Sequence, residues 1–120
     1  MQHHGKPALQ CQVIATVHFT QNSSELLPEE IASLQHAVPQ GNAAVSKVQV
    51  FGYCDDIGEA KWNFILSRQR ANAVAKLVAA SFPDTPLVTE GLGSLHPAGN
   101  NKTNKGRAMN RRAVVEICGR

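Results

Sequence analysis

The sequence predicts an α/β (α+β) fold, a two-layer sandwich with two helices on one face of a mixed four-stranded sheet. Two segments with helical periodicity alternate with runs of β-branched residues, in the order β-α-β-α-β-β. The strand-helix-strand units are expected to make right-handed crossovers. The 120 residues, 42% hydrophobic and 18% charged, suit one domain with one modest core.

The N-terminal part of the domain predicts one strand and one helix. Residues Gln10–Phe19 (QCQVIATVHF) are rich in β-branched residues, as strands are, and the polar segment Thr20–Leu27 follows as a loop. Pro28 opens a helix at a position where its missing N–H does no harm, and Glu29 and Glu30 suit the positive end of the helix dipole. The apolar side of this helix comprises Ile31, Leu34, Ala37 and Val38, and the helix is expected to stop at Pro39, Gln40 and Gly41.

The rest of the chain predicts three strands and a long helix. Val45–Gly52 alternates partly and is expected to be the second strand, followed by a helix over Trp62–Ser81. Leu87–Leu92 is a short third strand, and a polar loop of about fifteen residues leads to the last strand, Ala113–Cys118. Residues 10–120 are thus predicted to form a single domain. Residues 1–9 are expected to be a flexible N-terminal segment or an expression remnant, without a signal peptide.

Arg70 projects from the apolar face of the long helix. It lies four residues after Leu66 and four before Val74, and at about 100° per residue these positions share one face. That face comprises Asn63, Leu66, Arg70, Val74, Leu77 and Val78. A guanidinium turned toward the body of a domain is costly unless something pairs with it.

The run Gly52–Asp56, in which a predicted strand ends in two carboxylates, supplies the expected partner of Arg70. Two interpretations remain open from the residues alone. Asp55 and Arg70 either form an internal salt bridge, or together face a ligand that bears both charges. A carboxylate and a guanidinium held a few ångströms apart match a zwitterion, since one binds an ammonium and the other a carboxylate.

Charge and motifs exclude several other functions. The net charge is +3, mostly from Lys102–Arg112, which we interpret as a solvated loop rather than a nucleic-acid contact because no aromatic residue is interleaved. No nucleophile elbow, P-loop, HExxH or GxGxxG motif occurs, and the five histidines lack ligand spacing. Asp55 and Asp56 are adjacent and cannot act as a glycosidase pair on an extended segment. We therefore expect no enzyme activity, no metal and no cofactor.

Several motifs together resemble the OmpA-like C-terminal domain, the peptidoglycan-binding module of OmpA, Pal and MotB-type proteins. The similarity extends from about Val13 to Ile117. It rests on Val17-His18-Phe19-Thr20 with Leu26 and Pro28; on Gly52, Asp55, Gly58, Asn63, Leu66, Ser67, Arg70, Ala71 and Val74; and on Gly91-Leu92-Gly93, Pro97, Asn101, Thr103, Gly106-Arg107 and Asn110-Arg111-Arg112.

The resemblance implies non-catalytic binding of peptidoglycan in the periplasm, anchoring a larger envelope protein or complex such as an outer-membrane lipoprotein, a stator or a secretion-system component. Asp55 and Arg70 would hold the zwitterionic end of meso-diaminopimelate in the stem peptide. The groove would be completed by Asn63, Thr20, Gln21, Leu66 and, in support, Arg111. The alternative function is a protein-interaction module on the same scaffold with a degenerate wall pocket.

The chain departs from the family pattern beside the predicted site and carries a cysteine pair outside it. Cys54 stands where a small hydroxyl residue is usual, Tyr53 where histidine is common, and a second acid, Asp56, follows Asp55. Cys11 and Cys118 lie at the tips of two predicted strands, and they could be buried apolar residues or a disulfide. The resemblance, in which the first and last strands are neighbours, favours the disulfide.

Overall fold

A computed structural model of the protein describes residues 9–39 and 44–119. The elements are β1 (Gln10–His18), α1 (Pro28–Ala37), β2 (Val45–Gly52), α2 (Ala60–Ala79), β3 (Leu87–Gly91), α3 (Asn104–Asn110) and β4 (Arg112–Gly119). The predicted α+β class and the four strands are confirmed. Gln40 and Gly41, two of the residues expected to stop the first helix, lie outside the described residues.

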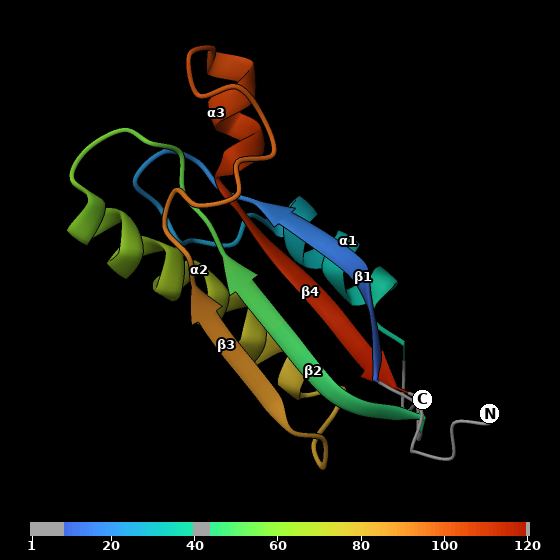
Figure 1. Cartoon of the computed structure of the whole chain (residues 1–120). Helices are drawn as coiled ribbons and strands as arrows, with labels where there is room; N and C mark the ends of the chain where they lie inside the picture. The colour runs from blue at the N-terminus through green and yellow to red at the C-terminus, as the bar shows by residue number, and fades with distance from the viewer. Residues whose placement is uncertain (1–8, 40–43, 120) are drawn as a thin grey trace, which may run out of the picture.

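The four strands form one mixed sheet in the order β1-β4-β2-β3. β4 is antiparallel to both of its neighbours, and β2 and β3 are parallel. β1, β2 and β3 therefore run in the same direction, and their carboxyl ends meet at one end of the sheet (Figure 1). The segments that follow these strands carry the predicted site residues.

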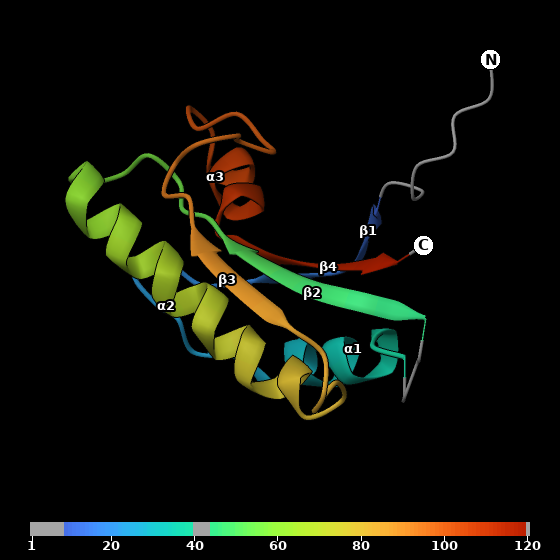
Figure 2. The ribbon, with the colours of Figure 1, turned by 60° about the horizontal axis from the view of Figure 1, so that its bottom comes forward.

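The helices α1 and α2 lie on one face of the sheet, as Figure 2 shows, and the hydrophobic core lies between them and the strands. Each fully buried aliphatic side chain there contributes about 1.5–3 kcal/mol relative to leaving it exposed. The largest such aliphatic side chains are Leu34, Val17, Val48, Val50, Val74, Val78 and Val115. No helix within residues 9–39 and 44–119 has the length and hydrophobicity to cross a membrane.

The helix α2 packs closely against the end of β2. Its buried side comprises Asn63, Ser67, Arg70, Ala71, Val74, Ala75 and Val78, whereas Leu66 and Leu77 lie half-buried at its margin. A Cβ atom on Gly52 would lie 1.8 Å from the backbone oxygen of Ser67, so only glycine allows this approach. The contact places Arg70, one turn after Leu66, beside the residues that follow β2.

The polar loop predicted before the last strand is wrong over Asn104–Asn110, because these residues form α3. The Thr103 hydroxyl caps the helix by accepting a hydrogen bond from the Gly106 backbone N–H at 2.9 Å. The sequence signal was weak because glycine and asparagine are poor helix formers. Tertiary packing requires this glycine, since a Cβ on Gly106 would lie 1.9 Å from the Asn100 oxygen.

A disulfide joins the first and last strands. Cys11 and Cys118 are paired directly across the β1–β4 ladder and are bonded, closing a sequence separation of 107 residues. Such a cross-link stabilises the fold mainly by restricting the unfolded chain.

Reduction of this disulfide is expected to lower the free energy of unfolding by about 2–4 kcal/mol. Urea unfolding with and without dithiothreitol measures the loss. The Cys11→Ser variant provides the control, because Cys11 is exposed and reductant should have no further effect on that protein. Equal urea midpoints for the oxidised and reduced wild type would contradict a stabilising role.

Candidate ligand-binding site

Arg70 is completely buried and holds two separate segments of the chain together. Its Nε donates to the Ser23 oxygen at 2.8 Å and its Nη2 to the Thr20 oxygen at 3.1 Å, both in the segment after β1. Its Nη1 donates to the Tyr53 oxygen at 3.0 Å and contacts the Cys54 sulfur at 3.4 Å, both after β2. The guanidinium also lies over the Phe19 ring, 5.3 Å from its centroid.

These contacts do not use every hydrogen-bond donor of Arg70. A guanidinium has five N–H donors, and four of those of Arg70 have partners among the described residues, so one N–H on Nη2 remains. Desolvation lowers the pKa of Arg70, and the nearby Cys54 and Asp55 partly oppose this shift. A ligand carboxylate would complete the hydrogen bonding of this buried cation.

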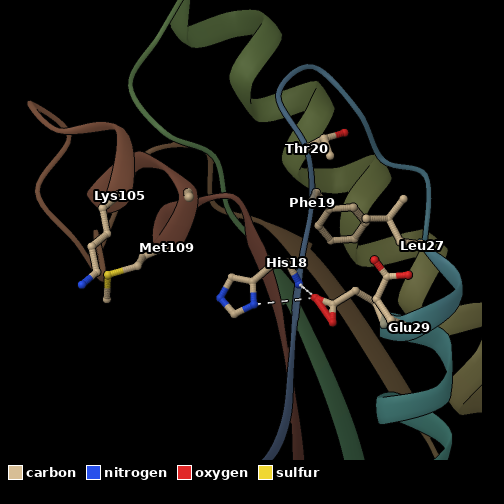
Figure 3. Close-up of a pocket in the computed structure, with 9 residues that line it drawn as sticks. His18, Phe19, Thr20, Leu27, Glu29, Lys105 and Met109 are labelled. Atoms are coloured by element: carbon tan, nitrogen blue, oxygen red, sulfur yellow. Dashed lines mark hydrogen bonds and ion pairs between the residues drawn. The ribbon is translucent and has the colours of Figure 1, made fainter.

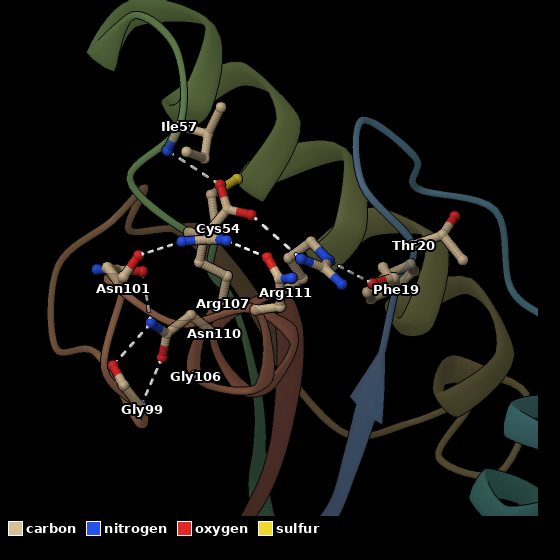
Figure 4. A network of polar contacts seen from close by, with 12 residues as sticks. Phe19, Thr20, Cys54, Ile57, Gly99, Asn101, Gly106, Arg107, Asn110 and Arg111 are labelled. Atoms are coloured by element: carbon tan, nitrogen blue, oxygen red, sulfur yellow. Dashed lines mark hydrogen bonds and ion pairs between the residues drawn. The ribbon is translucent and has the colours of Figure 1, made fainter.

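Asp55 follows β2 and is nearly buried, with 5% of its surface exposed. Its Oδ1 accepts from the Ile57 backbone N–H at 3.1 Å, and its Oδ2 accepts from Arg111 Nη1 at 3.3 Å (Figure 4). The internal Asp55–Arg70 salt bridge, one of the two sequence interpretations, is not formed: the ion pair of Asp55 is with Arg111. A carboxylate has about four acceptor positions, so about two remain on Asp55.

Arg111 connects three parts of the site. Besides Asp55, its guanidinium binds the Phe19 backbone oxygen through Nε at 3.0 Å. The residue follows α3 directly, and the neighbouring Asn110 secures that helix to the preceding loop. The fully buried Asn110 side chain accepts from the backbone N–H groups of Ala98 and Gly99 and donates to the Gly99 oxygen and to Asn101 Oδ1. Figure 4 shows Asn110 with Gly99 and Asn101 beside Arg111.

Cys54 stands where the resembling family usually has a hydroxyl residue, and its thiol also makes hydrogen bonds. Its thiol donates to the Asn63 backbone oxygen at 3.2 Å, and its sulfur accepts from Arg70. Burial raises the pKa of the Cys54 thiol, so it remains neutral at pH 7.

Asn63 is also buried, and its side-chain amide has no hydrogen-bond partner among residues 9–39 and 44–119.

The remaining predicted residues occupy the border of the site. Thr20 contributes its backbone oxygen to Arg70, while its side chain is exposed. Gln21 is the next residue in the same exposed turn. Leu66 lies half-buried on α2, one turn before Arg70. The structure therefore brings Asp55, Arg70 and Arg111 together, and the turn after β1 borders them. In the described part of the chain, no three histidine, cysteine or acidic residues gather as a metal site would require.

The contacts of two supporting residues were not predicted from the sequence because they depend on long-range packing. Ser67 on α2 accepts from the Gly93 backbone N–H at 2.9 Å, which holds the segment after β3 against the helix. Arg112 lies over the Tyr53 ring, 3.9 Å from its centroid, and donates to the His96 oxygen at 3.0 Å. Desolvation lowers the pKa of Arg112 and raises the pKa of Tyr53. The only signals in the sequence were the motif positions of Ser67 and Arg112.

A model of the OmpA family matches residues 18–111, which include every element of this site. The chain belongs to the OmpA family. The putative lipoprotein YfiB of Escherichia coli is 38% identical over 102 residues, covering 82% of this chain and 64% of the relative. The peptidoglycan-binding protein ArfA of Mycobacterium tuberculosis is 34% identical over 103 residues, covering 84% of this chain and 32% of the relative. This OmpA-family domain thus spans less than two thirds of the length of these curated relatives.

Solved structures agree with the fold. The cell wall anchor of the type VI secretion system from Pseudomonas aeruginosa superimposes with a TM-score of 0.70 at 25% identity, covering 94% of this chain and 87% of the other. The C-terminal domain of Helicobacter pylori MotB gives a TM-score of 0.71 at 22% identity, covering 85% and 82%. Membership of the OmpA family and the mixed four-stranded architecture are therefore shown by independent comparisons.

Proposed function

We propose that this domain binds peptidoglycan without catalysis, through the diaminopimelate residue of the stem peptide, and anchors a larger envelope protein to the cell wall. The observation that carries the proposal is the unused capacity of two opposite charges in one site. Arg70 has one N–H without a partner among the described residues, and Asp55 has about two acceptor positions left. A zwitterion satisfies both.

In this proposal the ligand ammonium binds Asp55 and the ligand carboxylate binds Arg70. Arg111 remains bonded to Asp55 and to the end of β1, which keeps the carboxylate oriented. The Asn63 amide supplies a further donor or acceptor on the same face of α2. Since Arg70 is completely buried, the carboxylate enters as the exposed turn at Thr20 and Gln21 shifts and releases one guanidinium edge. Each charge-assisted contact contributes about 1.5–3 kcal/mol.

The relatives support wall binding and an envelope location. One is described as a peptidoglycan-binding protein, one as a putative lipoprotein, and one solved neighbour as a cell wall anchor. The Cys11–Cys118 disulfide agrees with an oxidising compartment such as the periplasm. The proposed partner is therefore the wall polymer, and the protein that carries this domain is the anchored component.

Cosedimentation with purified sacculi tests the proposal. Walls whose stems contain diaminopimelate should bind the domain saturably and release no soluble fragments during incubation. Walls whose stems contain lysine should bind it more weakly, because lysine lacks the second carboxylate. Absence of saturable binding to diaminopimelate-containing walls would contradict the proposal, and it would favour the alternative of a protein-interaction module with a degenerate pocket.

A further inference from the structure

A groove of about 360 Å³ lies between α2 and β3, the strand at one edge of the sheet (Figure 1). We call it the α2–β3 groove. It is lined by Phe64, Ile65, Arg68, Thr89, Glu90 and Gly91, none of which belongs to the proposed stem-peptide site. By contrast, the groove that Figure 3 shows between Met109 and Leu27 includes Thr20, whose backbone oxygen binds Arg70, so it borders that site.

The outer side of β3 has backbone groups that no other described strand uses. β3 is the last strand in the sheet order, and its pairing is with β2. At the start of this pairing the Val48 N–H donates to the Pro86 oxygen at 2.9 Å. Since alternate residues of a parallel strand bond to the same neighbour, Val88 and Glu90 also face β2. The residues between them have N–H and C=O groups that point away from the sheet; they are Leu87, Thr89 and Gly91.

Apolar side chains flank this free edge on both faces of the sheet. On the helix side, Phe64 and Ile65 of α2 remain 45% and 40% exposed. Leu87 packs against the core on that same side, so alternation along β3 places Val88 on the opposite face, where it is 44% exposed. A cluster of exposed apolar side chains is a common mark of a protein–protein contact.

Arg68 and Glu90 give the α2–β3 groove two opposite charges that are not paired with each other. Both side chains are exposed, and neither makes an ion pair or a side-chain hydrogen bond within residues 9–39 and 44–119. Arg68 belongs to the helix side, and Glu90 projects toward the other face of the sheet. A strand beside β3 would therefore meet a positive charge with one residue and a negative charge with the next.

We propose that the free edge of β3 binds an extended segment of another protein, which adds to the sheet as a further strand. Its main chain bonds to the outward groups of Thr89 and Gly91. Its side chains alternate, with an acidic residue toward Arg68, a basic residue toward Glu90, and apolar residues on both sides of this pair. In such strand addition the main-chain hydrogen bonds give affinity, and the alternate side chains give specificity.

A second copy of this chain fits the edge less well than a different protein does. Symmetric pairing of two β3 strands about Thr89 would bring the Arg68 side chains of both copies toward each other, because these two residues line the same groove. Like charges that face each other across an interface oppose association. Charge complementarity therefore favours a partner that offers a carboxylate to Arg68 and a cation to Glu90.

Two short peptides, both acetylated and amidated, test the proposal. The first, Thr-Leu-Lys-Asp-Val-Leu-Thr, offers its lysine to Glu90 and its aspartate to Arg68 when it pairs antiparallel to β3 with the aspartate opposite Thr89. The second, Thr-Leu-Asp-Lys-Val-Leu-Thr, has the same composition with the two charges exchanged. Isothermal titration calorimetry should show that the first peptide binds about tenfold more tightly. Equal affinities, or no binding of the first peptide at about 1 mM, would overturn the inference.

Amide hydrogen exchange shows whether the first peptide adds as a strand. The N–H groups of Thr89 and Gly91 should exchange more slowly in its presence, because the peptide supplies their acceptors. The N–H groups of Val88 and Glu90 already face β2 and serve as the internal control, with little expected change. Binding without protection of Thr89 and Gly91 would contradict strand addition.

A charge-swap variant locates the preference in the groove. Arg68→Glu combined with Glu90→Lys should reverse the preference, so that the second peptide binds more tightly. Lys76→Glu combined with Asp84→Lys is the matched control, since both positions are exposed and lie outside the groove. This control should keep the wild-type preference.

The inference fails if the charge-swap variant also keeps the wild-type preference. Sedimentation velocity tests the remaining occupant, a second copy of the chain. A wild-type dimer that the first peptide dissociates would assign the edge to self-association and would overturn the inference, whereas we expect the wild type to sediment as a monomer.

Discussion

Replacing Asp55 with asparagine is expected to weaken binding of the diaminopimelate tripeptide by about 30-fold or more. The substitution keeps the shape of the side chain and the acceptor for the Ile57 backbone N–H, but it removes the charge that is proposed to bind the ligand ammonium. Loss of one partner in a desolvated charge pair costs about 2 kcal/mol or more. Isothermal titration calorimetry with the free tripeptide measures the effect.

The matched control for this variant is Asp56→Asn. Asp56 is the next residue and has the same charge, but it is exposed and makes no hydrogen bond or ion pair with residues 9–39 and 44–119. Its loss should change tripeptide affinity by no more than about twofold, the small contribution of an exposed charge. If the two variants lose affinity equally, binding depends on the overall charge of this segment and the assigned role of Asp55 is wrong.

Replacing Arg70 with methionine is expected to destabilise the fold by about 3–5 kcal/mol. The change leaves three backbone oxygens, those of Thr20, Ser23 and Tyr53, without the donor that Arg70 supplies; the Tyr53 contact is buried and the other two are partly buried. Each unsatisfied buried acceptor costs about 1–3 kcal/mol, which a methionine side chain only partly offsets by packing. Urea unfolding monitored by circular dichroism gives the free energy of unfolding for both proteins.

Arg68→Met is the control for this second prediction. Arg68 lies on α2 two residues before Arg70 and is exposed, so its replacement should change the free energy of unfolding by less than about 0.5 kcal/mol. Similar stabilities of the Arg70→Met variant and the wild type would show that the guanidinium does not hold the two loops together. Because Arg70 has this structural role, a loss of binding in an Arg70 variant must be normalised to its folded fraction.

The parts of the fold that the sequence predicted well depend on local patterns. The β-branched runs located all four strands, and Pro28 with its two following glutamates marked the start of α1. The helical period also placed Arg70 on the buried face of α2. Periodicity assigns a residue to a face, but it does not determine its hydrogen-bond partners.

The partners of Arg70 and Asp55 required the three-dimensional structure. Arg111 follows α3, a helix with a weak signal in the sequence. Its contact is with Asp55, which lies 56 residues earlier in the chain, and no local sequence pattern indicates such a contact. Likewise, Arg70 binds backbone oxygens, which every residue carries and which therefore leave no signature. The resemblance to the OmpA-like family predicted which residues bind the ligand, and the structure shows how these residues are held.

In the proposed function, Asp55 and Arg70 together bind a zwitterion. The most direct test is a calorimetric titration of the wild-type domain with two tripeptides that differ only at the third residue, meso-diaminopimelate or L-lysine. We expect the diaminopimelate peptide to bind about 10- to 100-fold more tightly, because only its side chain carries the carboxylate that is proposed to bind Arg70. Equal affinities for the two peptides would contradict the claim.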